Sequence, residues 1–97
     1  MDEVELGTPS VGPVLEATQR GRALARAIAG SNPGARVQDR GGYLRVLVPA
    51  RCSVTRTEIE RALGAPFLLP QDLEALMPAF KGVLSIEGDE VQWSSQR

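Results

Sequence analysis

The sequence predicts an α+β fold of two layers, in which three helices pack on mainly antiparallel sheet in the order β-α-β-β-(β)-α-α-β-β. Short runs of alternating apolar and polar residues are joined by glycine-containing turns, which is typical of antiparallel hairpins. Between these runs, apolar residues recur at helical spacing. The length of 97 residues and the apolar fraction of 42% suit one domain with one modest core.

The chain is expected to consist of a flexible tail at residues 1–10, one domain at residues 11–94 and a frayed end at residues 95–97. In the tail, glycine, proline and serine occur without apolar periodicity. The domain then opens with a short extended segment at residues 11–15. Pro13 has no backbone N–H to donate, so this segment is predicted to be an edge strand or the start of a strand.

The first helix is predicted at residues 19–29. Thr18 is expected to cap its N-terminus with a side-chain oxygen, and Gly30 is expected to end it in the left-handed conformation. One face of this helix is apolar at helical spacing and consists of Ala23, Leu24, Ala27 and Ile28.

A β-hairpin is predicted at residues 35–40 and 43–48. The preceding turn, Asn32-Pro33-Gly34, suits type I or II because proline presets φ and glycine accepts a positive φ. Gly41-Gly42 is expected to close the hairpin with a primed turn. Since side chains alternate along a strand, the core is predicted to contain Leu44, Val46 and Val48. The opposite, half-polar face is predicted to carry Tyr43, Arg45 and Leu47.

The second half of the domain is predicted to contain a short strand, two helices and a hairpin. The strand is expected at residues 51–54, and Thr-Arg-Thr-Glu at residues 55–58 fits a capping box at the start of a helix that ends at Gly64. Pro70 is expected in the first position of a shorter helix, which Pro78 ends.

The remaining apolar residues complete the predicted core. The segment between the two helices is expected to be buried at Phe67, Leu68 and Leu69. The shorter helix is expected to bury Leu73, Leu76 and Met77. Residues 83–86 and 91–93 alternate around a glycine-containing turn, which predicts a terminal hairpin in which Trp93 packs in the core or at its edge.

The composition argues against most kinds of catalytic site. The chain has no histidine, which removes the commonest general acid-base group and the commonest transition-metal ligand. Cys52 is the only cysteine, so it forms no internal disulfide and cannot supply a zinc site, and it has no histidine to activate it. Paired acidic residues stand where helix ends and turns favour them. We therefore expect no catalytic residue, no bound metal and no cofactor.

Charge is distributed unevenly along the chain. Residues 1–16 carry a formal charge of −4, residues 17–56 of +7 and residues 57–97 of −4, for a net charge of −1. The central excess of arginine indicates a basic face for an acidic partner or nucleic acid, or simply a solvated surface. A pI near 5.4 and a single aromatic residue, Tyr43, on a central strand disfavour nucleic acid. A small α+β binding module for nucleic acid or a small ligand remains the alternative function.

Several short motifs occur in one order between residues 11 and 93, and none of them is specific alone. They are Val11-Gly12-Pro13-Val14, Asn32-Pro33-Gly34, Asp39-Arg40, Tyr43 and Arg45, Thr55 to Glu60, Pro66-Phe67 and Phe80-Lys81-Gly82. Together they resemble the effector proteins, also called coupling or regulatory proteins, of bacterial soluble diiron monooxygenases. The resemblance is to the branch that oxidises toluene and other aromatic hydrocarbons.

The resemblance implies a protein that is not an enzyme. Such effectors hold no cofactor, bind the diiron hydroxylase component reversibly, and tune oxygen activation, coupling and regiospecificity. They function alongside a ferredoxin and an NADH-dependent reductase. No apolar run is long enough to span a membrane and the first residues do not form a secretory signal. The expectation is a cytoplasmic protein, monomeric when free, that binds no nucleic acid and no membrane.

Residue by residue, the resemblance places the contact with the hydroxylase on one loop, one polar strand face and the start of the domain. The predicted contact residues are Val11, Gly12, Pro13, Asn32, Pro33, Gly34, Asp39, Arg40, Tyr43 and Arg45. One feature departs from the family pattern: the first helix carries Arg20, Arg22 and Arg26 where a more acidic helix is expected. This departure indicates that the protein is matched to its own hydroxylase.

Overall fold

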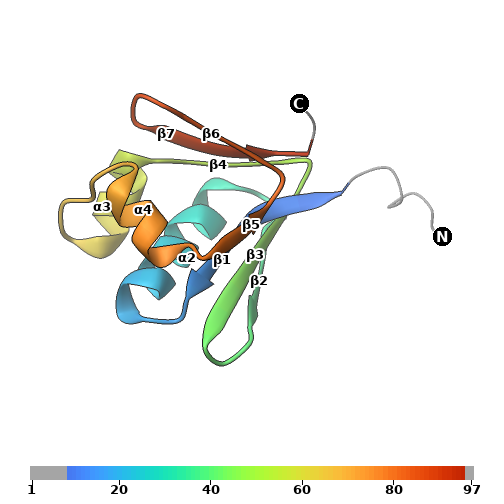
Figure 1. Cartoon of the computed structure of the whole chain (residues 1–97), viewed down its shortest axis with the longest axis horizontal. Coiled ribbons are helices and arrows are strands. Elements are labelled where there is room, and N and C mark those ends of the chain that lie inside the picture. Colours follow the sequence, from blue (N-terminus) through green and yellow to red (C-terminus); the bar gives the residue numbers. More distant parts are fainter. Residues whose placement is uncertain (1–8, 96–97) are drawn as a thin grey trace.

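The computed structural model describes residues 9–95, which form two antiparallel sheets around one core. The four-stranded sheet has the order β2-β3-β1-β5, and the three-stranded sheet has the order β4-β7-β6 (Figure 1). The strands are β1 (Ser10–Glu16), β2 (Arg36–Asp39), β3 (Tyr43–Pro49), β4 (Arg51–Thr55), β5 (Ala79–Lys81), β6 (Val83–Glu87) and β7 (Glu90–Ser94). The helices are α2 (Gln19–Ser31), α3 (Arg56–Leu63) and α4 (Gln71–Leu76). The predicted α+β class with antiparallel sheet and three helices is confirmed.

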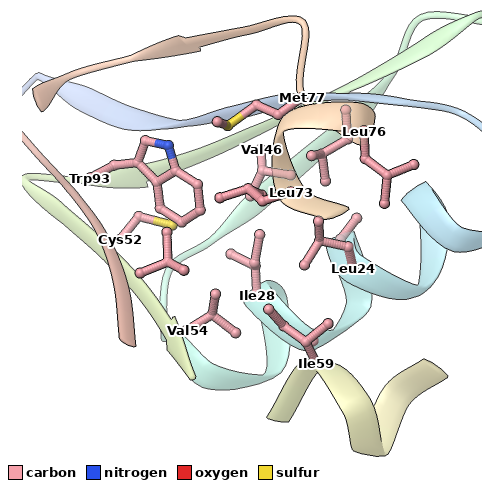
Figure 2. Close-up of a cluster of buried hydrophobic side chains, with 14 of the residues drawn as sticks. Leu24, Ile28, Val46, Cys52, Val54, Ile59, Leu73, Leu76, Met77 and Trp93 are labelled. Atoms are coloured by element: carbon pink, nitrogen blue, oxygen red, sulfur yellow. The ribbon is translucent and has the colours of Figure 1, made fainter. Parts of the chain in front are cut away.

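The core lies between α2, α4 and the inner faces of both sheets. Trp93 of β7 and Cys52 of β4 face Leu24 and Ile28 of α2, with Leu73 of α4 beside them (Figure 2). All five side chains are almost fully removed from solvent. Burial of apolar surface from all these elements in one cluster is the main source of stability for a chain of this size.

Strand β1 occupies a central position in its sheet, which corrects the prediction of an edge strand. It pairs with β3 on one side and β5 on the other. Pairing with β3 is recorded at Val11 and at Val14 but not at the two residues between them. Pro13, which has no N–H to donate to the ladder, stands in that gap. The strand begins at Ser10, one residue before the predicted segment, and residues 1–8 of the predicted tail lie outside the described residues.

Helix α2 begins as predicted and ends later than predicted. The Thr18 hydroxyl accepts the Gly21 N–H at 3.0 Å, as an N-cap should. Gly30 lies inside the helix, so the expected left-handed cap at that position is wrong. The helix continues to Ser31, and the C-cap residue is Asn32, whose side chain accounts for the difference. Its Nδ2 donates to the Ile28 carbonyl at 2.8 Å and so satisfies one of the last helical carbonyls.

The predicted hairpin is confirmed at β2 and β3, with the expected turns on either side. Gly34 has φ +86° and the Ala35 N–H donates to the Asn32 carbonyl, which is the pattern of a type II turn. Gly41 has φ +90° and Gly42 does not have a positive φ, as in a type II′ hairpin turn. The inward side chains of β3 are buried as predicted: Leu44, Val46 and Val48.

The chain passes from the first sheet to the second at Ala50, which has φ +68°. Its N–H donates to the Pro9 carbonyl and its carbonyl accepts the Ser95 N–H, both at 2.9 Å. Ser95 was expected in the frayed end, yet it is held at this corner; residues 96–97 lie outside the described part of the chain. Strand β4 then pairs with β7, so the predicted strand at residues 51–54 belongs to the second sheet.

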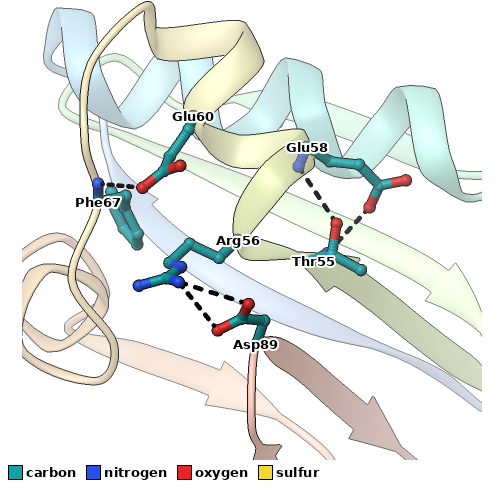
Figure 3. A network of polar contacts seen from close by, with 6 residues as sticks. All are labelled: Thr55, Arg56, Glu58, Glu60, Phe67 and Asp89. Atoms are coloured by element: carbon teal, nitrogen blue, oxygen red, sulfur yellow. Dashed lines mark hydrogen bonds and ion pairs between the residues drawn. The ribbon is translucent and has the colours of Figure 1, made fainter.

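Helix α3 has the predicted capping box. The Thr55 hydroxyl accepts the Glu58 N–H, and the Glu58 carboxylate accepts the Thr55 N–H at 2.9 Å (Figure 3). Gly64 ends the helix at φ +71°, in the left-handed conformation expected of it. Beyond the helix, Glu60 reaches forward and its Oε2 accepts the Phe67 N–H at 2.9 Å (Figure 3). This bond holds the connection to α4 against α3.

The segment before α4 is only partly buried. Phe67 is fully buried, but Leu68 is 56% exposed, so the expectation that Leu68 belongs to the core is wrong. The Leu68 N–H donates to the Asp72 carboxylate at 2.8 Å, which keeps this residue on the solvent side. Pro70 is the N-cap residue of α4 and not its first helical residue, a shift of one position from the prediction. The predicted apolar face of α4 is buried at Leu73, Leu76 and Met77.

Strand β5 was not predicted. It has only three residues, all exposed, and pairs with β1 at the edge of the four-stranded sheet. The terminal hairpin of β6 and β7 is confirmed, with Gly88 at φ +58° in its turn.

Candidate partner-binding surface

Cys52 is a core residue and not an exposed thiol. It is fully buried, and burial raises the pKa of its thiol to about 12, so the thiolate is absent at neutral pH. Among residues 9–95, no three acidic, cysteine or histidine side chains gather in a way that could hold a metal ion. In the same part of the chain, no helix is long and apolar enough to cross a membrane.

The outward side of the four-stranded sheet is a candidate contact surface. It is the side opposite to α2, and we call it the outer sheet face, formed by Val14, Glu16, Arg36, Tyr43, Arg45, Leu47, Ala79 and Lys81. Register brings them together: Glu16 lies opposite Tyr43, and Arg36 lies opposite Leu47. Tyr43 is 41% exposed and Arg45 is half-buried between Val14 and Gln38. The predicted pair Tyr43 and Arg45 thus lies on one accessible face.

The tip of the β2–β3 hairpin is ordered by Asp39, another predicted contact residue. One of its oxygens accepts the Gly41 N–H at 2.9 Å and the other pairs with Arg22 of α2 at 3.1 Å. The hydrogen bond from Gly41, followed by the interaction with Arg22, lowers the pKa of the Asp39 carboxyl from its ordinary value. Arg40 donates to the Gln38 side chain at 3.2 Å and is exposed. Asp39 therefore fixes the hairpin tip, while Arg40 is available to a partner.

Four of the predicted contact residues are inside the molecule. Val11, Gly12 and Pro13 are buried in β1, and a Cβ on Gly12 would stand 2.2 Å from the Val46 carbonyl oxygen. Asn32 is only 7% exposed. Its Nδ2 also donates to the Ser53 carbonyl, and its Oδ1 accepts the Ser53 N–H, so it joins α2 to β4. These residues shape the fold and offer no side chain to a partner.

The rest of the predicted loop is exposed but lies elsewhere. Pro33 and Gly34 are at the surface, and the nearest atom to a Cβ on Gly34 would be in the ring of Pro49. Pro49 is at the opposite end of β3 from Tyr43, a separation of about 20 Å along a strand of this length. The structure therefore does not combine this turn and the hairpin tip into a single small patch.

The outer side of α2 carries three shallow hollows, and Arg26 lines all of them. One, of about 270 Å³, lies between α2 and β2 over Val37 and Leu44. The others, of about 360 and 190 Å³, lie between α2 and α3 and include Arg61 and Leu63 respectively. They are open depressions lined in part by alanine side chains. They lie on the side of the molecule opposite to the outer sheet face.

Two cations of the outer sheet face, Arg36 and Lys81, were not among the predicted contact residues. Arg36 belongs to the predicted hairpin, but the face of the sheet on which its side chain lies is set by the strand register. Lys81 is in β5, which has no alternation that predicts a strand. The one sequence signal that includes Lys81 is the motif Phe80-Lys81-Gly82 of the family resemblance.

Comparison with known proteins identifies relatives over nearly the whole chain. The model of the MmoB/DmpM family matches residues 9–94. The effector subunit of the alkene monooxygenase system of Xanthobacter autotrophicus (strain ATCC BAA-1158 / Py2) is 40% identical over 85 residues, which cover 86% of this chain and 83% of that protein.

Solved structures with the same fold include chains from two structures of a phenol hydroxylase–regulatory protein complex. Their TM-scores are 0.77 and 0.74 at 21% and 22% identity; both alignments cover 88% of this chain, and they cover 95% and 98% of the matched chains. Regulatory protein B of soluble methane monooxygenase matches with a TM-score of 0.70 at 22% identity, over 90% of this chain and 65% of that one.

Proposed function

Because the chain belongs to the MmoB/DmpM family, we propose that it is the effector component of a multicomponent monooxygenase and binds the hydroxylase component. The observation that carries this proposal is the 40% identity to an alkene monooxygenase effector subunit over 86% of the chain. The fold likeness to chains from phenol hydroxylase–regulatory protein complexes agrees with it. The protein acts in the cytoplasm, beside a ferredoxin and an NADH-dependent reductase, and is not itself an enzyme.

An effector without chemistry of its own acts by differential binding. It favours one conformation of the diiron hydroxylase over another, and the ratio of its two affinities sets the size of the effect. The changes in oxygen activation, coupling and regiospecificity all follow from the shifted population. The substrate is a small hydrocarbon; the 40% identical alkene monooxygenase effector supports an alkene, and the sequence resemblance to the toluene branch supports an aromatic compound.

The contact with the hydroxylase includes Arg40, Tyr43 and Arg45. These are the predicted contact residues that are accessible and lie on neighbouring positions of β3 and the hairpin tip. Tyrosine and arginine are the residue types that most often anchor protein interfaces. Changing Tyr43 and Arg45 together to alanine should weaken hydroxylase binding while the unfolding midpoint stays close to that of the wild type.

The test of the function is steady-state hydroxylation by the hydroxylase encoded beside this chain, with its ferredoxin and reductase and this protein titrated in. Propene and toluene serve as the two substrates. A saturable rise in product formed per NADH consumed supports the effector role and gives an apparent affinity. If rate, coupling and product distribution stay unchanged for both substrates, the proposal is wrong.

A further inference from the structure

The outer sheet face carries more positive charge than its neighbours can neutralise. Arg36, Arg45 and Lys81 belong to it, and Arg40 lies at its edge beside Tyr43. Among the described residues, Glu16 is the only carboxylate on this face. The excess is thus concentrated on one side of one sheet, although the whole chain has a net charge of −1.

Strand register places these cations close to each other. Arg36 lies opposite Leu47, and Arg45 lies opposite Gln38, so the two guanidinium groups occupy diagonal positions on adjacent strands. Diagonal positions on one face have Cα atoms about 7–8 Å apart, within reach of long side chains. Lys81 lies opposite Gly12, in the row of the sheet that also holds Leu47 and Arg36.

Three arginines on other parts of the molecule have carboxylate partners among the described residues. Arg20 pairs with Asp72, Arg22 with Asp39 and Arg56 with Asp89, at 3.6, 3.1 and 3.3 Å. Within residues 9–95, no ion pair involves Arg36, Arg45 or Lys81. Three like charges repel one another in the free protein. A partner that brings carboxylates to them relieves this repulsion and so binds more favourably.

The centre of the same face is apolar. Leu47 is 9% exposed, Val14 is half-buried, and Ala79 lies opposite Val14 on β5. An apolar centre with a charged rim is the usual composition of a specific protein interface. Nucleic acid would instead be expected to stack on several exposed aromatic residues, and Tyr43 is the one aromatic residue on this face.

We propose that the outer sheet face docks on a carboxylate-rich surface of the hydroxylase, with Arg36, Arg45 and Lys81 facing its carboxylates around the Leu47 and Val14 centre. This inference rests on the function proposed above. It extends the contact across β2, β3, β1 and β5, and it names the chemistry that the partner presents.

The test is a double charge reversal, Arg36→Glu with Arg45→Glu, measured by binding to the hydroxylase in low and in physiological salt. The matched control is Arg26→Glu with Arg61→Glu, which changes the net charge equally on the outer side of α2 and α3. We expect the sheet variant to bind at least about tenfold more weakly and the control to stay within about twofold. Wild-type affinity should fall as salt rises, and less so for the neutral variant Arg36→Gln with Arg45→Gln.

Each outcome decides the proposal. Equal loss in both reversal variants means that only net charge matters, and unchanged binding of the sheet variant means that another face docks; either result overturns the inference while the effector role stands. If wild-type protein neither binds nor stimulates its hydroxylase, both proposals are wrong. If wild-type protein binds single-stranded RNA or DNA and the sheet variant does not, while hydroxylase binding is equal in both, the face serves nucleic acid. Circular dichroism of each variant establishes that it is folded.

Discussion

At the residue scale, Asn32 shows how a side chain that resembles a contact residue serves the fold. Its amide makes three hydrogen bonds to backbone groups, of Ile28 and Ser53, from a position that is 7% exposed. Buried polar groups of the backbone cost free energy when they lose their partner. The amide therefore links the end of α2 to β4.

Replacing Asn32 with alanine should lower the free energy of unfolding by about 2–3 kcal/mol, because buried backbone groups of α2 and β4 lose their partners. The measurement is urea unfolding followed by circular dichroism. Pro33→Ala, at the exposed neighbouring position, serves as the control and should change stability by less than about 1 kcal/mol. A loss in Asn32→Ala no larger than in the control would contradict the structural role.

Cys52 should be unreactive in the folded protein. Because burial raises its pKa to about 12, thiol reagents at pH 8 should modify it only after unfolding, which is measured by the rate of colour release from a disulfide reagent with and without urea. Rapid modification of the folded protein would contradict the burial.

The same shift makes stability depend on pH. The folded thiol has a higher pKa than the ordinary 9.0, so the folded state holds its proton where the unfolded state loses it. This contribution is complete below pH 9 and is lost as pH rises from 9 towards 12. Cys52→Ala should show a smaller loss of unfolding midpoint between pH 8 and pH 10 than the wild type, and equal losses would count against this assignment.

At the scale of elements, the capping box of α3 is the best example of a local signal that decides local structure. The Glu58 carboxylate accepts the Thr55 N–H, and this bond lowers the pKa of Glu58 from its ordinary value. A lowered folded-state pKa adds stability above the ordinary pKa of about 4.5, and that stability is lost as pH falls through the folded value. The pKa of the Asp39 carboxyl is also lowered, first by the hydrogen bond from the Gly41 N–H, so its contribution to stability is likewise lost at low pH.

Thr55→Ala should destabilise the protein by about 1 kcal/mol, since it removes the acceptor for one orphan N–H of the helix. Thermal unfolding at pH 7 measures this. Thr57→Ala, two residues further along the chain and exposed, is the matched control and should lie within about 0.5 kcal/mol of the wild type. If the two variants lose equal stability, the capping box contributes nothing specific.

Elements with a strong local signal were predictable, and those that depend on distant partners were not. The cap at Thr55, the hairpin turn at Gly41 and the alternation at Leu44 and Val46 each act within a few residues. Gly30 has a good local reason to end a helix, but the bond from Asn32 to Ile28, fixed by β4, extends the helix past it. Strand β5 exists because β1 offers it an edge, which no local pattern reveals.

The same distinction explains the candidate surface. Tyr43 and Arg45 were placed on an exposed face from alternation alone. Val11 and Pro13 were expected at a contact because they belong to a motif of the family resemblance, whereas their strand is paired on both sides and both residues are buried. Lys81 joins Arg36 only through the pairing of β5 with β1, a strand that is distant from it in sequence.

At the scale of the whole molecule, the two sheets share one core and should unfold together. Cys52 and Trp93 of the three-stranded sheet pack with Leu24 and Ile28, which α2 also turns towards the four-stranded sheet (Figure 2). A single cluster that contains residues from both sheets leaves neither with a core of its own. Small domains built in this way usually unfold in one cooperative transition.

We expect the urea midpoint from Trp93 fluorescence, which reports on the three-stranded sheet, to coincide with the midpoint from far-ultraviolet circular dichroism, which reports on all elements. Trp93 is the only tryptophan, so its signal has one source. Midpoints that differ by more than the error of measurement would mean that the second sheet is a separate unfolding unit.

The corner at Ala50 has a practical consequence. Its N–H is bonded to Pro9 and its carbonyl to Ser95, so the first and last described residues are both tied to one point of the backbone. A chain in which Ser95 is joined to Pro9 by a short glycine-rich linker, and cut at the exposed Gly41-Gly42 turn, would be a circular permutant with nearly unchanged packing. Such a permutant would carry its new ends at the tip of the β2–β3 hairpin, next to Tyr43, where a fluorophore would report hydroxylase docking directly.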